Sequence, residues 1–241
     1  MKTLLILGIC HLFGDYYLQT TGMTRKKKDH TGTLLIHAAL YAVSMGIIFL
    51  CAPVVPALIS WTIISLTHLI VDRIRISFDK KHEKQKLWSF IIDQGIHLLI
   101  IFGCYMLFLR FKQGFVQQQL YGLPWFRTVL VYVTIFCIII KPAAVMITAV
   151  FENRFSQAGK ANDDETDPGA GTWIGILERI IVVALVLLNA PSAIGFVLTA
   201  KSIARVKQIE KNSGFAERYL IGTLLSVGIA LGAVLLIREL C

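Results

Sequence analysis

The sequence predicts an all-α fold, a polytopic transmembrane helical bundle with about eight membrane segments. Composition is the first reason: 56% of the 241 residues are hydrophobic and only 16% are charged, whereas soluble domains carry about a quarter charged residues. Distribution is the second reason, because the apolar residues form runs of about 20, the length that a helix needs to cross a hydrocarbon core of about 30 Å. The abundance of Leu, Ile, Val and Phe also excludes a disordered chain.

Eight apolar segments are expected in order along the chain. They cover about 2–20, 33–52, 54–76, 88–110, 125–150, 173–190, 191–206 and 219–238. The first is expected to be retained rather than cleaved as a signal peptide, because its apolar run continues to Leu18 and the bulky Ile9 precedes Cys10. The seventh is short, and it either spans the bilayer or only dips into it.

Basic residues concentrate in alternate links between these segments. The links after the first, third, fifth and seventh segments are basic, starting with the run Arg25-Lys26-Lys27-Lys28, whereas those after the second, sixth and eighth are almost uncharged. By the positive-inside rule the basic links are cytoplasmic and both termini are extracytoplasmic. The same rule accounts for the net charge of +9, and the absence of any nucleic-acid recognition motif argues against a nucleic-acid partner.

The chain is expected to divide into two transmembrane halves. Residues 1–111 form a four-helix half, residues 112–123 an outer loop, and residues 124–241 the C-terminal half, with a polar cytoplasmic linker at 151–171. The acidic run DDETD in this linker is interpreted as solvated rather than as a cation site, because it lacks EF-hand spacing. The five cysteines have no C-x-x-C spacing and are interpreted as small core residues.

Seven ionisable side chains in the N-terminal half carry the chemistry of the prediction. They are His11, Asp15, His37, His68, Asp72, Asp93 and His97. Each costs about 2.5–3.5 kcal/mol at the centre of a membrane helix, so each needs a reason to be there. Six of them form three His/Asp pairs at a spacing of four, which places one imidazole and one carboxylate on the same helix face. These are ligands of zinc, manganese and iron.

The expected topology brings all seven residues to one depth in the membrane. Each lies about 6–15 Å from the cytoplasmic end of its own helix, at 1.5 Å per residue. This convergence predicts one or two divalent ions, with zinc as the first choice and manganese or iron as alternatives. A proton or ion pathway and a structural hydrogen-bond network between helices remain as alternative interpretations.

The C-terminal half contains a second group of charged residues. Arg179, Lys201 and Arg205 are expected on the cytoplasmic side, where Arg and Lys donors suit a phosphate group. In the alternative interpretation, Lys201 and Arg205 extend to the lipid headgroups and Glu178 forms an ion pair with Arg179 or Arg205.

Several motifs resemble those of a bacterial multi-pass inner-membrane family of unknown function. H-L-F-G-D-Y-Y-L-Q (11–19), L-L-I-H (34–37), T-H-L-I-V-D (67–72) and D-Q-G-I-H (93–97) carry the resemblance. I-G-I-L-E-R, A-K-S-I-A-R and L-I-G-T-L-L-S resemble its longer members and extend it over most of the chain. The resemblance implies a bacterial inner-membrane location and little about chemistry. A looser likeness in spaced His and Asp motifs is to membrane-bound metal-dependent hydrolases, and the seven-helix zinc amide hydrolases of the ceramidase and progestin-receptor type are comparable in site design.

The first functional hypothesis is an integral membrane metal-dependent hydrolase acting on a lipid or lipid phosphate at the cytoplasmic leaflet. A bound metal lowers the pKa of its water to about 7, and Asp15, Asp72 or Asp93 would act as general base. Gln19 and Gln94 flank the motifs and would orient a ligand or substrate. The expected partners are membrane lipid and an amphiphilic small molecule. Alternatives are a divalent-metal or proton transporter that uses the same residues, and a membrane sensor or scaffold.

The chain lacks the motifs of three large hydrolase and nucleotide-binding classes. It has no G-x-S-x-G, no H-E-x-x-H and no P-loop sequence. Serine hydrolase, zincin and P-loop functions are therefore excluded.

Overall fold

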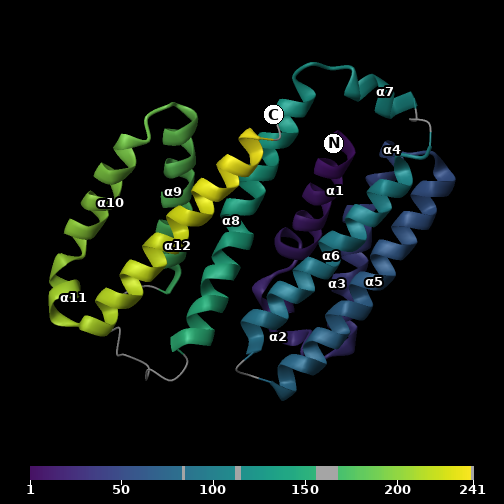
Figure 1. Ribbon diagram of the computed structural model, residues 1–241. Coiled ribbons are helices and arrows are strands. Elements are labelled where there is room, and N and C mark those ends of the chain that lie inside the picture. The colour runs from purple at the N-terminus through teal and green to yellow at the C-terminus, as the bar shows by residue number, and fades with distance from the viewer. Residues whose placement is uncertain (83–84, 112–114, 156–167, 240–241) are drawn as a thin grey trace. The chain divides into compact units, whose positions relative to one another are not determined.

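The computed structural model describes residues 1–82, 85–111, 115–155 and 168–239, and every regular element in these ranges is helical (Figure 1). The predicted all-α class is therefore confirmed. The elements are α1 (Lys2–Leu12), the π-helix η1 (Phe13–Tyr17), α2 (Thr21–Lys26), α3 (Thr31–Met45), α4 (Ile48–Cys51), α5 (Val54–Lys81), α6 (Lys86–Phe108), α7 (Phe115–Tyr121), α8 (Phe126–Phe155), α9 (Pro168–Leu187), α10 (Ser192–Ala204), α11 (Val206–Lys211) and α12 (Ser213–Arg238).

By helix length and hydropathy the chain is a multi-pass membrane protein. Five helical stretches of the described residues are long and apolar enough to span a bilayer: Thr31–Cys51, Val54–Lys81, Lys86–Phe108, Phe126–Arg154 and Ser213–Leu236. Each of the eight expected apolar segments coincides with a helix, but the expected count of eight spans is not supported. The first segment is an 11-residue helix that continues as a π-helix, and the seventh is the 13-residue α10. The predicted side of the termini stays a prediction.

The chain divides into two compact units, an N-terminal unit (Met1–Cys137) and a C-terminal unit (Ile138–Cys241). The expected halves, 1–111 and 124–241 with the loop 112–123 between them, stay a prediction. Residues 112–114 of that loop, residues 156–167 of the expected linker and the whole DDETD run lie outside the described residues.

In the N-terminal unit, α1 and η1 pack against α3, α1 also packs against α6, and α5 packs against both α3 and α6. A hydrophobic core lies toward one end of these helices and includes the fully buried Leu7, Tyr41, Met45, Ile48 and Ala57. The buried ionisable side chains lie next to this core on the same helices. Packing of the apolar core therefore holds these helices in position relative to one another.

The turn from α1 into η1 depends on a glycine. A Cβ on Gly14 would lie 2.8 Å from Cδ2 of Tyr41 and 3.2 Å from its Cα, so only glycine lets α3 approach this closely. The Ser44 hydroxyl donates to the Cys10 carbonyl, 2.7 Å away, where the α-helical pattern changes. A π-turn shifts the helical register, and Asp15 lies within this turn, after His11 at the end of α1.

In the C-terminal unit, α9 packs along α12, and α10 and α11 connect them in sequence. Pro142 lies inside α8, where it lacks the N–H that would bond the carbonyl four residues earlier. Arg179 of α9 is buried and donates from Nε to the Ile139 carbonyl and from Nη2 to the Ile140 carbonyl, 3.2 Å away. Arg179 thus binds the backbone of α8 next to the proline.

Candidate metal centre

The structure brings all seven ionisable residues of the N-terminal unit together, and we call this group the His/Asp cluster. His11 comes from α1, Asp15 from η1, His37 from α3, His68 and Asp72 from α5, and Asp93 and His97 from α6. The Asp15 side chain is 9% exposed, and the other six residues are at most 3% exposed. Buried carboxylates require compensation by cations or hydrogen bonds, so the composition of the cluster decides its chemistry.

A first triad consists of Asp15, His37 and His68. Each offers one ligand atom, and these atoms lie within 4.8 Å of one another. Nε2 of His37 is 3.4 Å from Oδ1 of Asp15 and 3.1 Å from Nε2 of His68. The His68 ring stacks on the ring of Tyr41, with the planes 4° apart and the centroids at 3.6 Å, which fixes the orientation of this imidazole.

A second triad consists of Asp72, Asp93 and His97, with the same spacing of ligand atoms. Oδ1 of Asp93 lies 3.5 Å from Nε2 of His97. Among the residues that the structure describes, neither atom has a hydrogen-bond partner. Two buried ligand atoms that face each other at this distance, with no other partner, suit a cation between them.

The two triads meet at His37, whose Nε2 is 3.4 Å from Oδ2 of Asp72. Two ligand atoms that each lie about 2.0–2.1 Å from a tetrahedral zinc ion are about 3.3–3.4 Å apart. The contacts within the triads, 3.1 Å for His37–His68, 3.4 Å for Asp15–His37 and 3.5 Å for Asp93–His97, therefore have the spacing of a coordination sphere. These residues could hold one or two ions.

The unpartnered buried atoms also argue against a purely structural hydrogen-bond network. Besides the facing atoms of Asp93 and His97, Nδ1 of His37 and Nδ1 of His68 have no hydrogen-bond partner within the described part of the chain. Native structures satisfy about nine in ten buried polar groups. A network that served only to join helices would be expected to satisfy more of these atoms.

His11 belongs to neither triad, contrary to its expected role beside Asp15. Its Nε2 lies 3.2 Å from Oε1 of Gln94, which only accepts hydrogen bonds, so Nε2 carries the proton. Its Nδ1 therefore accepts from the Tyr41 hydroxyl, 3.0 Å away. The three His/Asp pairs at a spacing of four also do not match the triads, since only Asp93 and His97 belong to the same triad. The triads are assembled mainly by contacts between different helices.

Gln94, which the sequence places beside a motif, bridges the two triads. Its amide nitrogen donates to Oδ2 of Asp15 at 2.8 Å and to Oδ2 of Asp93 at 3.1 Å. With the bond to His11, this side chain connects α1, η1 and α6. The Gln19 amide satisfies both its atoms when its nitrogen donates to the Asp15 carbonyl at 2.9 Å and its oxygen accepts from Nζ of Lys27 at 3.1 Å.

Sequence reasoning missed three residues of the centre. Lys27 donates from Nζ to Oδ2 of Asp72 at 2.8 Å, and Arg75 donates from Nη1 to Oδ2 of Asp93 at 3.0 Å. Tyr41 contacts His11 and His68. Tyr41 lies four residues after His37, and Arg75 lies three after Asp72, so each could have been expected on the same helix face as its neighbour in the cluster. The sequence does not distinguish Lys27 from the other three basic residues of the run 25–28.

The second predicted group is not assembled into one anion site. Lys201 donates to Oε2 of Glu178 at 2.5 Å and to Oγ1 of Thr223 at 3.0 Å. Arg179 is occupied by backbone carbonyls, and the Arg205 guanidinium donates to Oε1 of Gln208 at 2.7 Å. These contacts favour the alternative of an internal ion pair, with Lys201 as the partner of Glu178. The phosphate role of the three residues stays a prediction.

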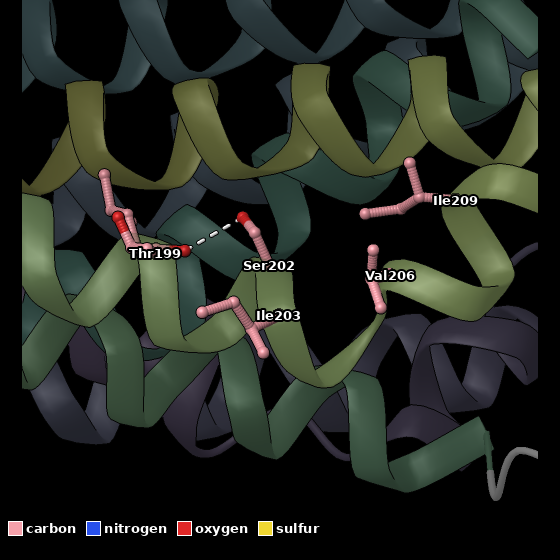
Figure 2. Close-up of a pocket in the computed structure, with 6 residues that line it drawn as sticks. Thr199, Ser202, Ile203, Val206 and Ile209 are labelled. Atoms are coloured by element: carbon pink, nitrogen blue, oxygen red, sulfur yellow. Dashed lines mark hydrogen bonds between the residues drawn. The ribbon is translucent and has the colours of Figure 1, made fainter.

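A pocket of about 360 Å³ lies in the C-terminal unit (Figure 2). It is lined by Leu198, Thr199, Ser202, Ile203, Val206 and Ile209. The Ser202 hydroxyl donates to the Leu198 carbonyl at 2.9 Å, so it is satisfied within its own helix. This lining is apolar apart from hydroxyl groups and offers no acid, base or metal ligand for catalysis.

Comparison with known proteins places the centre in a matched region. Residues 3–121 match a family described as "Protein of unknown function (DUF3307)". The match includes the whole His/Asp cluster, Lys27 and Arg75, whereas the motifs of the C-terminal unit lie beyond it. No curated protein and no solved structure matches the chain. The expected likeness to a family of unknown function is thus found for the N-terminal residues.

Proposed function

We propose that the protein is an integral membrane metal-dependent hydrolase that acts on a lipid or lipid phosphate. The observation that supports this most is the pair of buried triads joined at His37, whose ligand atoms lie within 4.8 Å of one another in each triad and make four contacts of 3.1–3.5 Å. Sites with two ions about 3.5–4 Å apart are typical of phosphatases and other hydrolases. Imidazole and carboxylate ligands favour zinc, with manganese or iron as alternatives.

The residues have distinct roles in this proposal. Asp15, His37 and His68 would hold one ion, and Asp72, Asp93 and His97 a second. A bound divalent ion would supply hydroxide by lowering the pKa of its water to about 7. A carboxylate oxygen of Asp15, Asp72 or Asp93 that is not engaged by an ion would take up the proton.

The centre is proposed to open toward the cytoplasmic leaflet of a bacterial inner membrane, with both termini extracytoplasmic. The basic run 25–28 is cytoplasmic by the positive-inside rule. Lys27 belongs to this run and contacts Asp72 directly, which supports a position of the cluster near that face. This one-sided position favours an enzyme over a carrier, whose site needs access from both sides.

A proton or divalent-metal transporter is the second candidate. One observation favours it: hydrogen bonds and close contacts connect His11, Gln94, Asp15, His37 and His68 in a continuous series. Chains of buried Asp and His residues relay protons in membrane transporters. Reconstituted vesicles separate the candidates, because only a transporter moves zinc or protons across a sealed bilayer.

The metal content of the purified protein tests the proposed site. Protein extracted under mild conditions without chelator is expected to contain about one or two equivalents of zinc, manganese or iron by elemental analysis. His68→Ala and Asp93→Ala should each remove metal from one triad. His30→Ala is the matched control, because His30 is exposed and outside the cluster. Metal-free wild-type protein would contradict the proposal, and metal-loaded protein would next be screened for turnover of lipid extracts.

A further inference from the structure

Two cations lie at the outer edge of the His/Asp cluster, and we call Lys27 and Arg75 the rim cations. Their side chains are 10% and 26% exposed, whereas those of Asp72 and Asp93 beneath them are 3% and 2% exposed. Within the run 25–28, the other three basic residues are exposed and only Lys27 is buried. A molecule that approaches the cluster past these cations meets positive charge first, which favours an anion.

Each rim cation forms an ion pair with a carboxylate of the second triad. Nζ of Lys27 binds Oδ2 of Asp72, the same atom that faces Nε2 of His37. Arg75 binds Oδ2 of Asp93 through Nη1. A divalent ion on these carboxylates would repel both cations, because like charges a few ångströms apart in a buried site interact strongly.

The rim cations have second acceptors to which they can turn. Nζ of Lys27 lies 3.1 Å from the amide oxygen of Gln19, and Nε of Arg75 lies 3.7 Å from Oδ2 of Asp79. The Arg75 guanidinium also lies over the ring of Phe90, at 5.2 Å from its centroid. Release from Asp72 and Asp93 would therefore leave both cations held at the rim.

The charge of the centre changes sign when two ions are bound. If the imidazoles are neutral, the net charge without metal is −2. It is the sum of two rim cations and four carboxylates, which are Asp15, Asp72, Asp79 and Asp93. One divalent ion makes the centre neutral, and two make it +2. A buried centre with excess positive charge is stabilised by an anion, so the loaded site should bind one.

We propose that Lys27 and Arg75 form the anion-binding pair of the metal centre and select a substrate with a phosphate group. Without metal they neutralise Asp72 and Asp93, and with metal bound they bind the phosphate beside the ions. The guanidinium supplies two parallel donors and the ammonium a compact charge, a combination suited to phosphate oxygens. This inference rests on the proposed function, since the ions must first take the carboxylates.

Calorimetric titration of the zinc-loaded full-length protein with inorganic phosphate tests the pair. Wild-type protein should bind phosphate, and Lys27→Met and Arg75→Met should each weaken binding about 10- to 100-fold, as expected for loss of a charge-assisted bond. Zinc content should be retained, because each substitution removes a cation that competes with the metal. Lys26→Met and Arg73→Met are matched controls, since both residues are exposed neighbours.

A second titration identifies the source of the phosphate group. Nanodiscs of phosphatidylcholine with and without phosphatidic acid replace the detergent, and inorganic phosphate is omitted. Binding of phosphatidic acid indicates a lipid headgroup, whereas binding of inorganic phosphate alone indicates a soluble phosphate. Wild-type protein that binds neither would overturn the inference.

The outcomes separate the anion pair from the metal centre. Zinc-loaded Lys27→Met and Arg75→Met proteins that bind phosphate as tightly as wild type would refute the pair and leave the metal centre standing. Wild-type protein that takes up no zinc would refute both. Lys27→Arg keeps the charge and guards against misfolding: it should retain phosphate binding within about 10-fold of wild type, and loss of binding in folded protein would contradict the proposed role of charge. Arg75→Lys keeps the charge but loses the two parallel donors, so it should bind phosphate more weakly than wild type and more tightly than Arg75→Met.

Discussion

His11 and His37 are both fully buried imidazoles, but their nitrogens have different partners. Both nitrogens of His11 are used by Gln94 and Tyr41. Nε2 of His37, in contrast, faces one oxygen of Asp15, one oxygen of Asp72 and a nitrogen of His68. At the residue scale, His37 has the surroundings of a metal ligand, and His11 those of a side chain that positions Gln94.

This difference predicts unequal losses of metal. His37→Ala should lower zinc content by about one equivalent, because a ligand position is lost. His11→Ala should keep the stoichiometry and weaken zinc affinity about 10- to 100-fold, the usual effect of removing a group that orients the ligands. Elemental analysis after dialysis and competition with a chromophoric chelator measure the two quantities. Equal loss of zinc in both variants would mean that His11 is itself a ligand.

At the scale of elements, the π-helix η1 sets the position of Asp15 relative to α3. The close approach at Gly14 brings the backbone of α3 next to η1. Asp15 of η1 therefore contacts His37 of α3. A regular α-helix through residues 11–17 would carry Asp15 in a different register. The ligand geometry of the first triad therefore depends on a backbone feature and not only on the ligand residues.

Gly14→Ala tests this dependence. Its Cβ would meet the ring and Cα of Tyr41, and overpacking against backbone typically costs about 1–3 kcal/mol. Thermal unfolding in detergent should show the loss, and zinc affinity should fall with it because η1 must shift. Gly8→Ala in α1 is the matched control, since a Cβ there meets no atom within 4 Å. Zinc binding at wild-type strength in Gly14→Ala would show that the register of η1 is not required.

The elements were largely predictable from the sequence, because length and apolar composition decide which segments become helices in a membrane. The cluster residues were also predictable, since each buried His or Asp is too costly in lipid without a role. The triads were not, because the contact of Asp15 with His37 depends on packing between helices and on the π-turn. The sequence used Lys27 only to predict the membrane orientation, since nothing in a run of basic residues indicates which one is buried.

At the scale of the whole molecule, the candidate chemistry is confined to one of the two units. All seven cluster residues and both rim cations lie in the N-terminal unit, Met1–Cys137, as does the family match over residues 3–121. The C-terminal unit has its own partly buried ion pair, Glu178 with Lys201, and no group of metal ligands among its described residues. Metal should therefore stabilise one unit directly and leave the other unchanged.

Removal of metal by a chelator tests this division. A ligand at 100 times its Kd stabilises the folded state by about 2.7 kcal/mol. On addition of chelator, hydrogen exchange should therefore accelerate in η1, α3, α5 and α6, which carry the triads. Peptides from α9 and α12 should exchange as before. His68→Ala protein is the control and should show a smaller response, because it has already lost a ligand of the first triad. Acceleration spread equally over both units would contradict a centre confined to the N-terminal unit, since a bound ion protects first the helices that hold it.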